Sequence, residues 1–190
     1  MSKKIGVVLM AYGTPRSRDE ILPYYTDIRR GRPPTDEQLA DLTRRYEAIG
    51  GLSPLARLTE AQRDSLQSAL NTAHPDRFDV RLGLKHAHPM IEAATQDLID
   101  SGVESIVGIV LAPHYSSYSI GQYLDRVKSV AEPAKVPVAG VESWATESAF
   151  VEFLAADLSA RLAHAAKPVR VLFTAHSLPV RIIESGDPYK

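Results

Sequence analysis

The chain has 190 residues, of which 44% are hydrophobic and 24% charged, with 22 basic and 23 acidic side chains. This composition excludes a disordered chain. The net charge of −1 argues against a nucleic-acid-binding protein, which would carry a basic excess. The sequence contains no cysteine, which excludes disulfides, thiolate metal sites and an iron–sulfur cluster in these residues.

Membrane insertion and secretion are also disfavoured. The longest apolar run, Ile106 to Pro113, falls far short of the roughly 18 residues that span a bilayer. The apolar run Ile5–Met10 near the N-terminus is short for a signal peptide and leads into no small-residue cleavage site. We therefore expect a cytoplasmic protein with no integral membrane segment.

Five short apolar runs are typical of buried parallel strands. They lie at Ile5–Met10, Asp79–Leu84, Ile106–Leu111, Val136–Val141 and Val169–Thr174. All but the second are continuous rather than alternating, as expected when helices cover both faces of a sheet. The first run opens the chain, and helical patterns separate it from the later ones. The sequence therefore predicts an α/β fold with a mostly parallel sheet flanked by helices.

Three apolar stripes at helical spacing lie between these strands. The first runs from Leu58 to Ala73 and the second from Ile91 to Ile99. Pro89 suits the first turn of the second helix, and Gly102 ends it. The third stripe consists of Phe150, Val151, Leu154, Leu158 and Leu162, with Thr146 or Ser148 as the N-cap.

The spacing of the elements predicts three parts. Residues 1–143 form a first α/β domain, residues 144–167 a connecting helix, and residues 168–190 the start of a second α/β domain. About 15 residues follow the last strand, too few to complete a parallel βαβ unit. Either that strand joins the first sheet, or the second domain is incomplete within this sequence.

The residues after each predicted strand carry the main signal for chemistry, because ligands of open α/β sheets bind beyond the carboxyl ends of the strands. Four of the six histidines and three of the eight tyrosines follow strands directly. They are Tyr12, His86, His88, His114, Tyr115, Tyr118 and His176. No nucleotide-binding, serine-hydrolase or zinc-protease motif is present. Imidazole and phenol groups in one place can bind a metal ion and move protons near neutral pH.

Each histidine also has a structural interpretation. His88 precedes the proline that starts a helix, so capping that turn is the favoured role. His86 and His88 could share a metal, because alternate residues of an extended segment face the same way. His114 could hydrogen-bond its own loop. His176 is the strongest functional candidate, because a buried strand would deliver it directly to the rim.

The segment from Arg29 to Arg45 is rich in arginine and carries its own carboxylates. One interpretation is a solvated helix with internal ion pairs. The other is that some guanidinium groups bind ligand carboxylates, which they match bidentately. The pair Gly50-Gly51 would let the backbone approach a flat ligand closely.

Six segments together resemble the ferrochelatases, most closely the bacterial coproporphyrin III ferrochelatases. They read AYGTP, YYTDIRRGRPP, RYEAIGGLSPL, GLKHAHP, VLAPHYSSYS and TAHSLP, in the family's order. The resemblance implies a chelatase-like fold of two similar Rossmann-like domains with a porphyrin cleft between them. It also implies a lyase-class metal chelatase that inserts Fe²⁺ into coproporphyrin III in heme biosynthesis.

The resemblance assigns roles to individual residues. His176 matches the catalytic histidine that binds Fe²⁺, and Tyr12 matches a substrate-binding tyrosine that becomes an axial ligand of the iron porphyrin. His86 matches a histidine near the cleft, which makes it a candidate metal ligand. The residues that match those holding the porphyrin carboxylates are Arg29, Arg45, Tyr46, Ser53 and Tyr123.

The resemblance departs from the family pattern at the end, since the glutamate that partners the histidine would lie beyond Lys190. We therefore expect an N-terminal part of a ferrochelatase, and its activity alone stays open. Iron is substrate, no organic cofactor is expected, and a heme-accepting protein is a candidate partner; the oligomeric state stays open. The polar segment Arg16–Gln38 favours the tetracarboxylate coproporphyrin. Alternatives are a protoporphyrin chelatase, a cobalt or nickel tetrapyrrole chelatase, or a non-catalytic porphyrin or heme carrier.

Overall fold

The computed structural model describes residues 4–189, which fall into two compact units. Within the described residues, unit 1 comprises 4–111 and 123–140, and unit 2 comprises 112–122 and 141–189. We describe each unit by itself. The predicted division at residues 143 and 167 stays a prediction.

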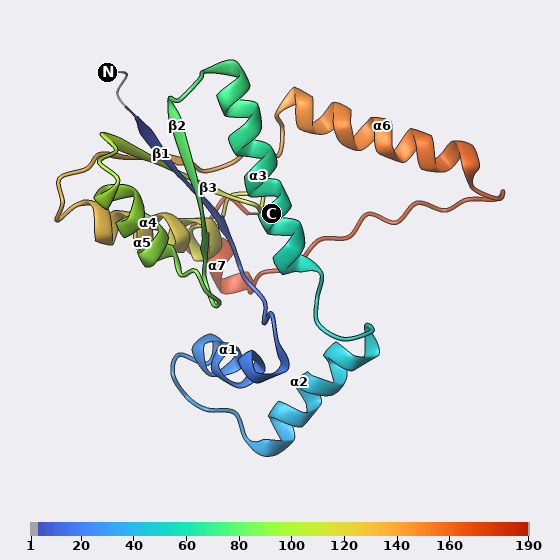
Figure 1. Cartoon of the computed structure of the whole chain (residues 1–190). Helices are drawn as coiled ribbons and strands as arrows, with labels where there is room; N and C mark the ends of the chain where they lie inside the picture. The colour runs from blue at the N-terminus through green and yellow to red at the C-terminus, as the bar shows by residue number, and fades with distance from the viewer. Residues whose placement is uncertain (1–3, 190) are drawn as a thin grey trace. The chain divides into compact units, whose positions relative to one another are not determined.

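Unit 1 is built on a parallel sheet in the order β2-β1-β3-β4 (Figure 1). Its strands are β1 (Ile5–Ala11), β2 (Phe78–Leu84), β3 (Ser105–Val110) and β4 (Val138–Val141). The central strand β1 pairs in parallel with both β2 and β3. The predicted α/β class is confirmed, and the first four predicted strands lie within two residues of those observed.

Helices cover both faces of this sheet, α3 (Leu55–Ala73) on one side and α4 (Ile91–Asp100) with α5 (Gln122–Ala131) on the other (Figure 1). Leu66 and Leu70 of α3 pack against the cluster around Val7 and Leu9. Gly6 precedes Val7 and therefore faces the opposite side of the sheet. A Cβ placed on Gly6 would lie 3.0 Å from the side chain of Leu98 on α4. The alternation of side chains along β1 therefore supplies both layers of the core.

Two further helices of unit 1 lie in the chain between β1 and α3. A 3₁₀ turn, η1 (Arg18–Glu20), leads into α1 (Ile21–Ile28), and α2 (Asp36–Ala48) follows. The capping box of α2 joins Thr35 and Gln38: each side chain accepts a hydrogen bond from the other residue's backbone N–H. These helices contribute Tyr24, Asp27 and Tyr46 to the site described below.

Unit 2 contains the π-helix η2 (Ser117–Gly121), α6 (Ser148–His164) and α7 (Val180–Glu184). The helix predicted from the stripe Phe150–Leu162 is confirmed, although Glu147 rather than Thr146 or Ser148 is its N-cap. Its apolar stripe is not buried; the side chains of Val151 and Leu154 are both 49% exposed. Among the helices of residues 4–189, none has the length and apolar character needed to cross a membrane.

The predicted fifth strand, Val169–Thr174, is wrong. These residues form no strand, and Phe173 is 88% exposed. Apolar, β-branched composition favours a strand, but a strand also needs a neighbour to satisfy its backbone N–H and C=O groups. No strand in the described part of unit 2 provides that neighbour, so composition alone misled the prediction.

Candidate functional site

The loops after β1 and β2 bring Tyr12 and His86 together. The backbone ladder continues past the strands: Lys85 N–H donates to Ala11 C=O at 2.9 Å, and His86 N–H donates to Tyr12 C=O at 3.0 Å. The rings of Tyr12 and His86 are 4.5 Å apart between centroids, tilted by 59°. The phenol and the imidazole that the sequence placed at two strand ends are therefore direct neighbours.

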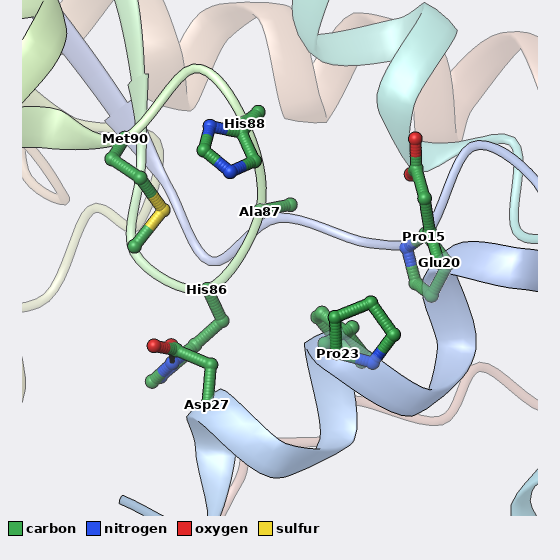
Figure 2. A pocket seen from close by; sticks show the side chains of 9 residues that line it. Pro15, Glu20, Pro23, Asp27, His86, Ala87, His88 and Met90 are labelled. Atoms are coloured by element: carbon green, nitrogen blue, oxygen red, sulfur yellow. Dashed lines mark hydrogen bonds and ion pairs between the residues drawn. The ribbon is translucent and has the colours of Figure 1, made fainter. Parts of the chain in front are cut away.

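A third residue, Asp27 of α1, holds the imidazole of His86. Nδ1 of His86 lies 2.7 Å from Oδ2 of Asp27, and Figure 2 shows the carboxylate beside the ring. Burial lowers the pKa of His86, and this effect outweighs the hydrogen bond and charge of Asp27, which act to raise it. A neutral ring that donates Nδ1–H to Asp27 keeps its lone pair on Nε2, the nitrogen able to bind a metal or accept a proton.

Gly13 permits the close approach of these two loops. Its φ is +89°, a left-handed conformation that favours glycine. A Cβ at this position would lie 2.9 Å from Cβ of Ala87 and 3.1 Å from the Ala87 nitrogen. Any larger side chain would therefore push residues 86–88 away from Tyr12.

Two further tyrosines, Tyr24 and Tyr46, interact with the residues that follow Tyr12. The hydroxyl of Tyr24 donates to the carbonyl of Gly13 at 3.3 Å, and the hydroxyl of Tyr46 lies 3.3 Å from Oγ1 of Thr14. Burial raises the pKa of Tyr12, and the nearby Asp27 and Tyr46 raise it further. Burial likewise raises the pKa of Tyr24. Tyr12 and Tyr24 are consequently neutral hydrogen-bond donors at neutral pH.

A buried tyrosine and two cations brace the β2 end of the site. Tyr123 is 5% exposed, and Nζ of Lys85 lies 4.9 Å from the centre of its ring. Arg126 makes two hydrogen bonds of 2.6 Å to the carboxylate of Glu92 and a third of 2.7 Å to the backbone carbonyl of Lys85. Burial, together with the charge of Arg126, lowers the pKa of Lys85. Arg126 thus fixes the backbone from which Lys85 and His86 project.

A pocket of about 320 Å³ opens beside the Asp27–His86 pair. Figure 2 shows His88 and Met90 further along the same loop, with Pro15, Glu20 and Pro23 across the pocket. His88 is exposed and takes no part in the ring contact of His86 with Tyr12. The predicted capping role of His88 is wrong, because Met90 is the N-cap of α4.

The predicted carboxylate-binding residues occupy different positions in unit 1. Arg45 of α2 has a side chain 75% exposed and forms an ion pair of 2.7 Å with Asp41. Nε of Arg29 donates to the carbonyl of Arg32 at 3.2 Å. Oγ of Ser53 accepts a hydrogen bond of 3.2 Å from the backbone N–H of Leu55, at the start of α3. Two members of this set interact electrostatically with Tyr12: Tyr46 raises the pKa of Tyr12, and Tyr12 raises the pKa of Tyr123.

His176 belongs to unit 2 and is exposed. The expectation that a buried strand delivers it is wrong, because residues 169–174 form no strand. Its backbone carbonyl accepts a hydrogen bond of 2.8 Å from the Tyr189 hydroxyl. It lines a second pocket of about 320 Å³ with Ser177, Ile183 and Tyr189 among its neighbours. His114, also in unit 2, is exposed.

Sequence reasoning missed Asp27, Tyr24 and Arg126. Tyr24 and Asp27 are three residues apart on α1, a spacing that puts two side chains on one helical face. That signal was available, but choosing which face turns toward the strand ends required the fold. Arg126 gave no local signal, since its partners Glu92 and Lys85 lie 34 and 41 residues away.

Resident metal centres need several donors in one place. Within residues 4–189, no three side chains of His, Cys, Asp or Glu gather so that they could hold a metal ion. Tyr12 and His86 offer one phenol oxygen and one imidazole nitrogen. This donor set suits a ligand that brings further donors of its own.

Unit 1 is an open parallel α/β sheet with phenol, imidazole and cationic groups at its carboxyl-terminal edge, where proteins of this class bind their ligands. The sequence model of the Ferrochelatase family matches residues 4–190, so the chain belongs to the ferrochelatase family.

Three curated relatives are named coproporphyrin III ferrochelatase. The chain is 44% identical to the protein of Oceanobacillus iheyensis, 46% to that of Halalkalibacterium halodurans and 45% to that of Geobacillus kaustophilus. These matches cover 99%, 98% and 100% of the chain. The chain spans 62% of the length of each relative.

Proposed function

We propose that the chain serves the insertion of Fe²⁺ into coproporphyrin III, a lyase-class step of heme biosynthesis. Membership of the ferrochelatase family and the names of the relatives support this activity. The observation that carries the proposal is the contact of Tyr12 with His86, itself bonded to Asp27, at the edge where a ligand is expected. We expect the activity in the cytoplasm, with a heme-accepting protein downstream.

The chemistry requires that Fe²⁺ lose water, that two pyrrole N–H protons leave, and that the four ring nitrogens bind the metal. The products are the iron porphyrin and two protons. We assign His176 as Fe²⁺ ligand and proton acceptor, because a neutral imidazole can perform either role. This assignment rests on the family resemblance and on the exposure of the ring.

Tyr12 is assigned as the axial ligand of the iron porphyrin. Its raised pKa means that the phenol is protonated before iron arrives. Iron must therefore displace the hydroxyl proton to bind the oxygen. The neighbouring Nε2 of His86 is available to accept that proton, since Nδ1 faces Asp27.

The porphyrin carboxylates are assigned to Arg29, Arg45, Tyr46, Ser53 and Tyr123. Arg45 forms an exposed ion pair with Asp41, and such pairs contribute only about 0.2–1 kcal/mol, so a ligand carboxylate can compete for it. Coproporphyrin offers four carboxylates where protoporphyrin offers two. The arginine-rich composition of residues 16–38 favours the more acidic ring.

Anaerobic incubation of the chain with Fe²⁺ and coproporphyrin III tests the proposal. We expect the fluorescence of the free porphyrin to fall as absorption bands of the iron porphyrin appear, and His176→Ala to abolish this change. Porphyrin binding without metal insertion would contradict the proposal and favour the non-catalytic carrier. Faster reaction with protoporphyrin, or with Co²⁺ or Ni²⁺, would contradict the substrate assignment.

A further inference from the structure

Asp187 is a buried carboxylate for which the proposed reaction has no role. It is 7% exposed and lies within unit 2. Its Oδ2 accepts three hydrogen bonds: from Ser116 Oγ at 3.0 Å, from Ser117 N–H at 2.7 Å and from Ser117 Oγ at 2.6 Å. A buried carboxylate is costly unless it is hydrogen-bonded, and this one is fully engaged.

These donors belong to the N-terminus of the π-helix η2. Ser116 is its N-cap and also accepts the N–H of Tyr118 at 3.2 Å. Hydrogen bonds, first among them that of the Ser117 hydroxyl, lower the pKa of Asp187 to about 2. The carboxylate is therefore an anion that cannot act as a proton acceptor near neutral pH. π-Helices are rare and occur frequently at functional sites.

The other carboxylate oxygen of Asp187 connects the N-terminus of η2 to His176 through Tyr189. Oδ1 accepts the N–H of Tyr189 at 2.9 Å, and the Tyr189 hydroxyl donates to the carbonyl of His176 at 2.8 Å. The intervening chain forms α7 and turns back at Gly186, whose φ is +91°. Residues 176 and 189 are thereby joined directly, and Asp187 ties the closed loop to η2.

We propose that Asp187 and Tyr189 are positioning residues that hold the backbone of His176 relative to the N-terminus of η2. The proposal rests on the assignment of His176 to metal insertion, which it deepens. The hydrogen bond that reaches His176 ends on its backbone carbonyl, so both residues act through the backbone of His176. Residues 169–179 form no helix or strand that could orient the histidine, and residues 169–177 are exposed.

Substitutions distinguish the hydrogen bond between Tyr189 and His176 from the hydrogen bonds of Asp187 to Ser116, Ser117 and Tyr189. Tyr189→Phe removes only the hydroxyl that bonds His176. Asp187→Asn has one acceptor oxygen, so keeping the bonds to Ser116 and Ser117 would turn its NH₂ toward the N–H of Tyr189. Asp187→Ala removes the hydrogen bonds to Ser116 and Ser117 as well as the one to the N–H of Tyr189. Asp157→Asn is the matched control, because Asp157 forms an exposed ion pair with Arg161 on α6.

The first measurement does not depend on activity. We expect Tyr189→Phe and Asp187→Asn to shift and broaden the Cε1–H NMR resonance of His176, assigned by its loss in His176→Ala. The resonances of His74 and His164 should stay unchanged in these variants. In the Asp157→Asn control, the resonance of His176 should also stay unchanged. A His176 resonance identical to the parent's in Tyr189→Phe and in Asp187→Ala would overturn the proposal. If Asp187→Ala does not fold, Tyr189→Phe decides alone.

The second measurement uses metal insertion by the parent and the variants. We expect Tyr189→Phe to lower kcat roughly twofold to tenfold with little change in KM, the effect of one hydrogen bond. An equal fall in kcat for Asp157→Asn would contradict the proposal. A parent that inserts no iron would refute the proposed function, whereas the NMR result would still decide whether Tyr189 positions His176.

Discussion

Oδ2 of Asp27 lies 2.7 Å from Nδ1 of His86, across 59 residues of sequence. This contact occupies Nδ1 and leaves Nε2 as the available ring nitrogen of His86, whose ring centroid lies 4.5 Å from that of Tyr12. Helix α1 and the end of β2 are therefore coupled through one carboxylate. The coupling makes His86 a member of the site rather than an isolated loop residue.

Replacing Asp27 with asparagine should lower the pKa of His86. The carboxylate raises that pKa by its hydrogen bond and charge, against a larger lowering by burial, so its removal leaves burial unopposed. NMR titration of the porphyrin-free chain measures this, with the His86 resonance assigned by His86→Ala. Asp36→Asn on α2 serves as control. An unchanged or higher pKa in Asp27→Asn would contradict the account.

Gly13→Ala should destabilise unit 1 more than Gly31→Ala does. Both glycines have positive φ, +89° and +81°, but a Cβ on Gly31 would meet nothing within 4 Å. Backbone strain alone should cost Gly31→Ala about 1–2 kcal/mol. The contact with Ala87 should bring Gly13→Ala to roughly 2–5 kcal/mol. Urea unfolding gives both values, and equal losses would show that the Ala87 contact is unimportant.

Stability should depend on pH through Glu92. The hydrogen bonds of Arg126 hold the pKa of Glu92 below its usual range. At pH values between the pKa of Glu92 in the folded chain and its pKa in the unfolded chain, about 4.3, the unfolded chain binds more protons than the folded chain does. The contribution is complete above that unfolded value and is lost as the pH falls through the folded pKa.

Unfolding measured from about pH 6 down to about pH 3 should accordingly show a smaller loss in Glu92→Gln than in the parent. Glu37→Gln, on the exposed start of α2, supplies the comparison. Identical slopes for the parent and Glu92→Gln would mean that the Arg126 pair does not couple to folding.

Arg29→Ala and Arg45→Ala should each weaken coproporphyrin binding roughly two- to fivefold, the range for an exposed ion pair of about 0.5–1 kcal/mol. Fluorescence quenching by the protein measures the Kd. Arg81→Ala on β2 is the control, since its side chain pairs with Asp79 in the same unit. Wild-type affinity in both variants would remove these arginines from the proposed carboxylate set.

The four strands of unit 1 could be predicted from the sequence because helices cover both faces of the sheet. Strands buried on both faces consist of continuous apolar residues. The sequence also placed Tyr12 and His86 at one edge, since the ends of parallel strands coincide. The run Val169–Thr174 failed because a strand requires a partner that composition does not specify. Asp27 and Arg126 were missed for a related reason: their partners are distant in sequence, so only the folded backbone reveals them.

The absorption spectrum of iron coproporphyrin bound to Tyr12→Phe tests the central assignment most directly, because the substitution removes one oxygen and leaves the ring beside His86. We predict that the bands of the bound iron porphyrin shift relative to the parent, while the affinity for metal-free coproporphyrin changes little. His88→Ala, altering an exposed neighbour of the site, should leave the spectrum as it is in the parent. An identical spectrum in Tyr12→Phe and the parent would contradict the assignment of Tyr12 as the iron ligand.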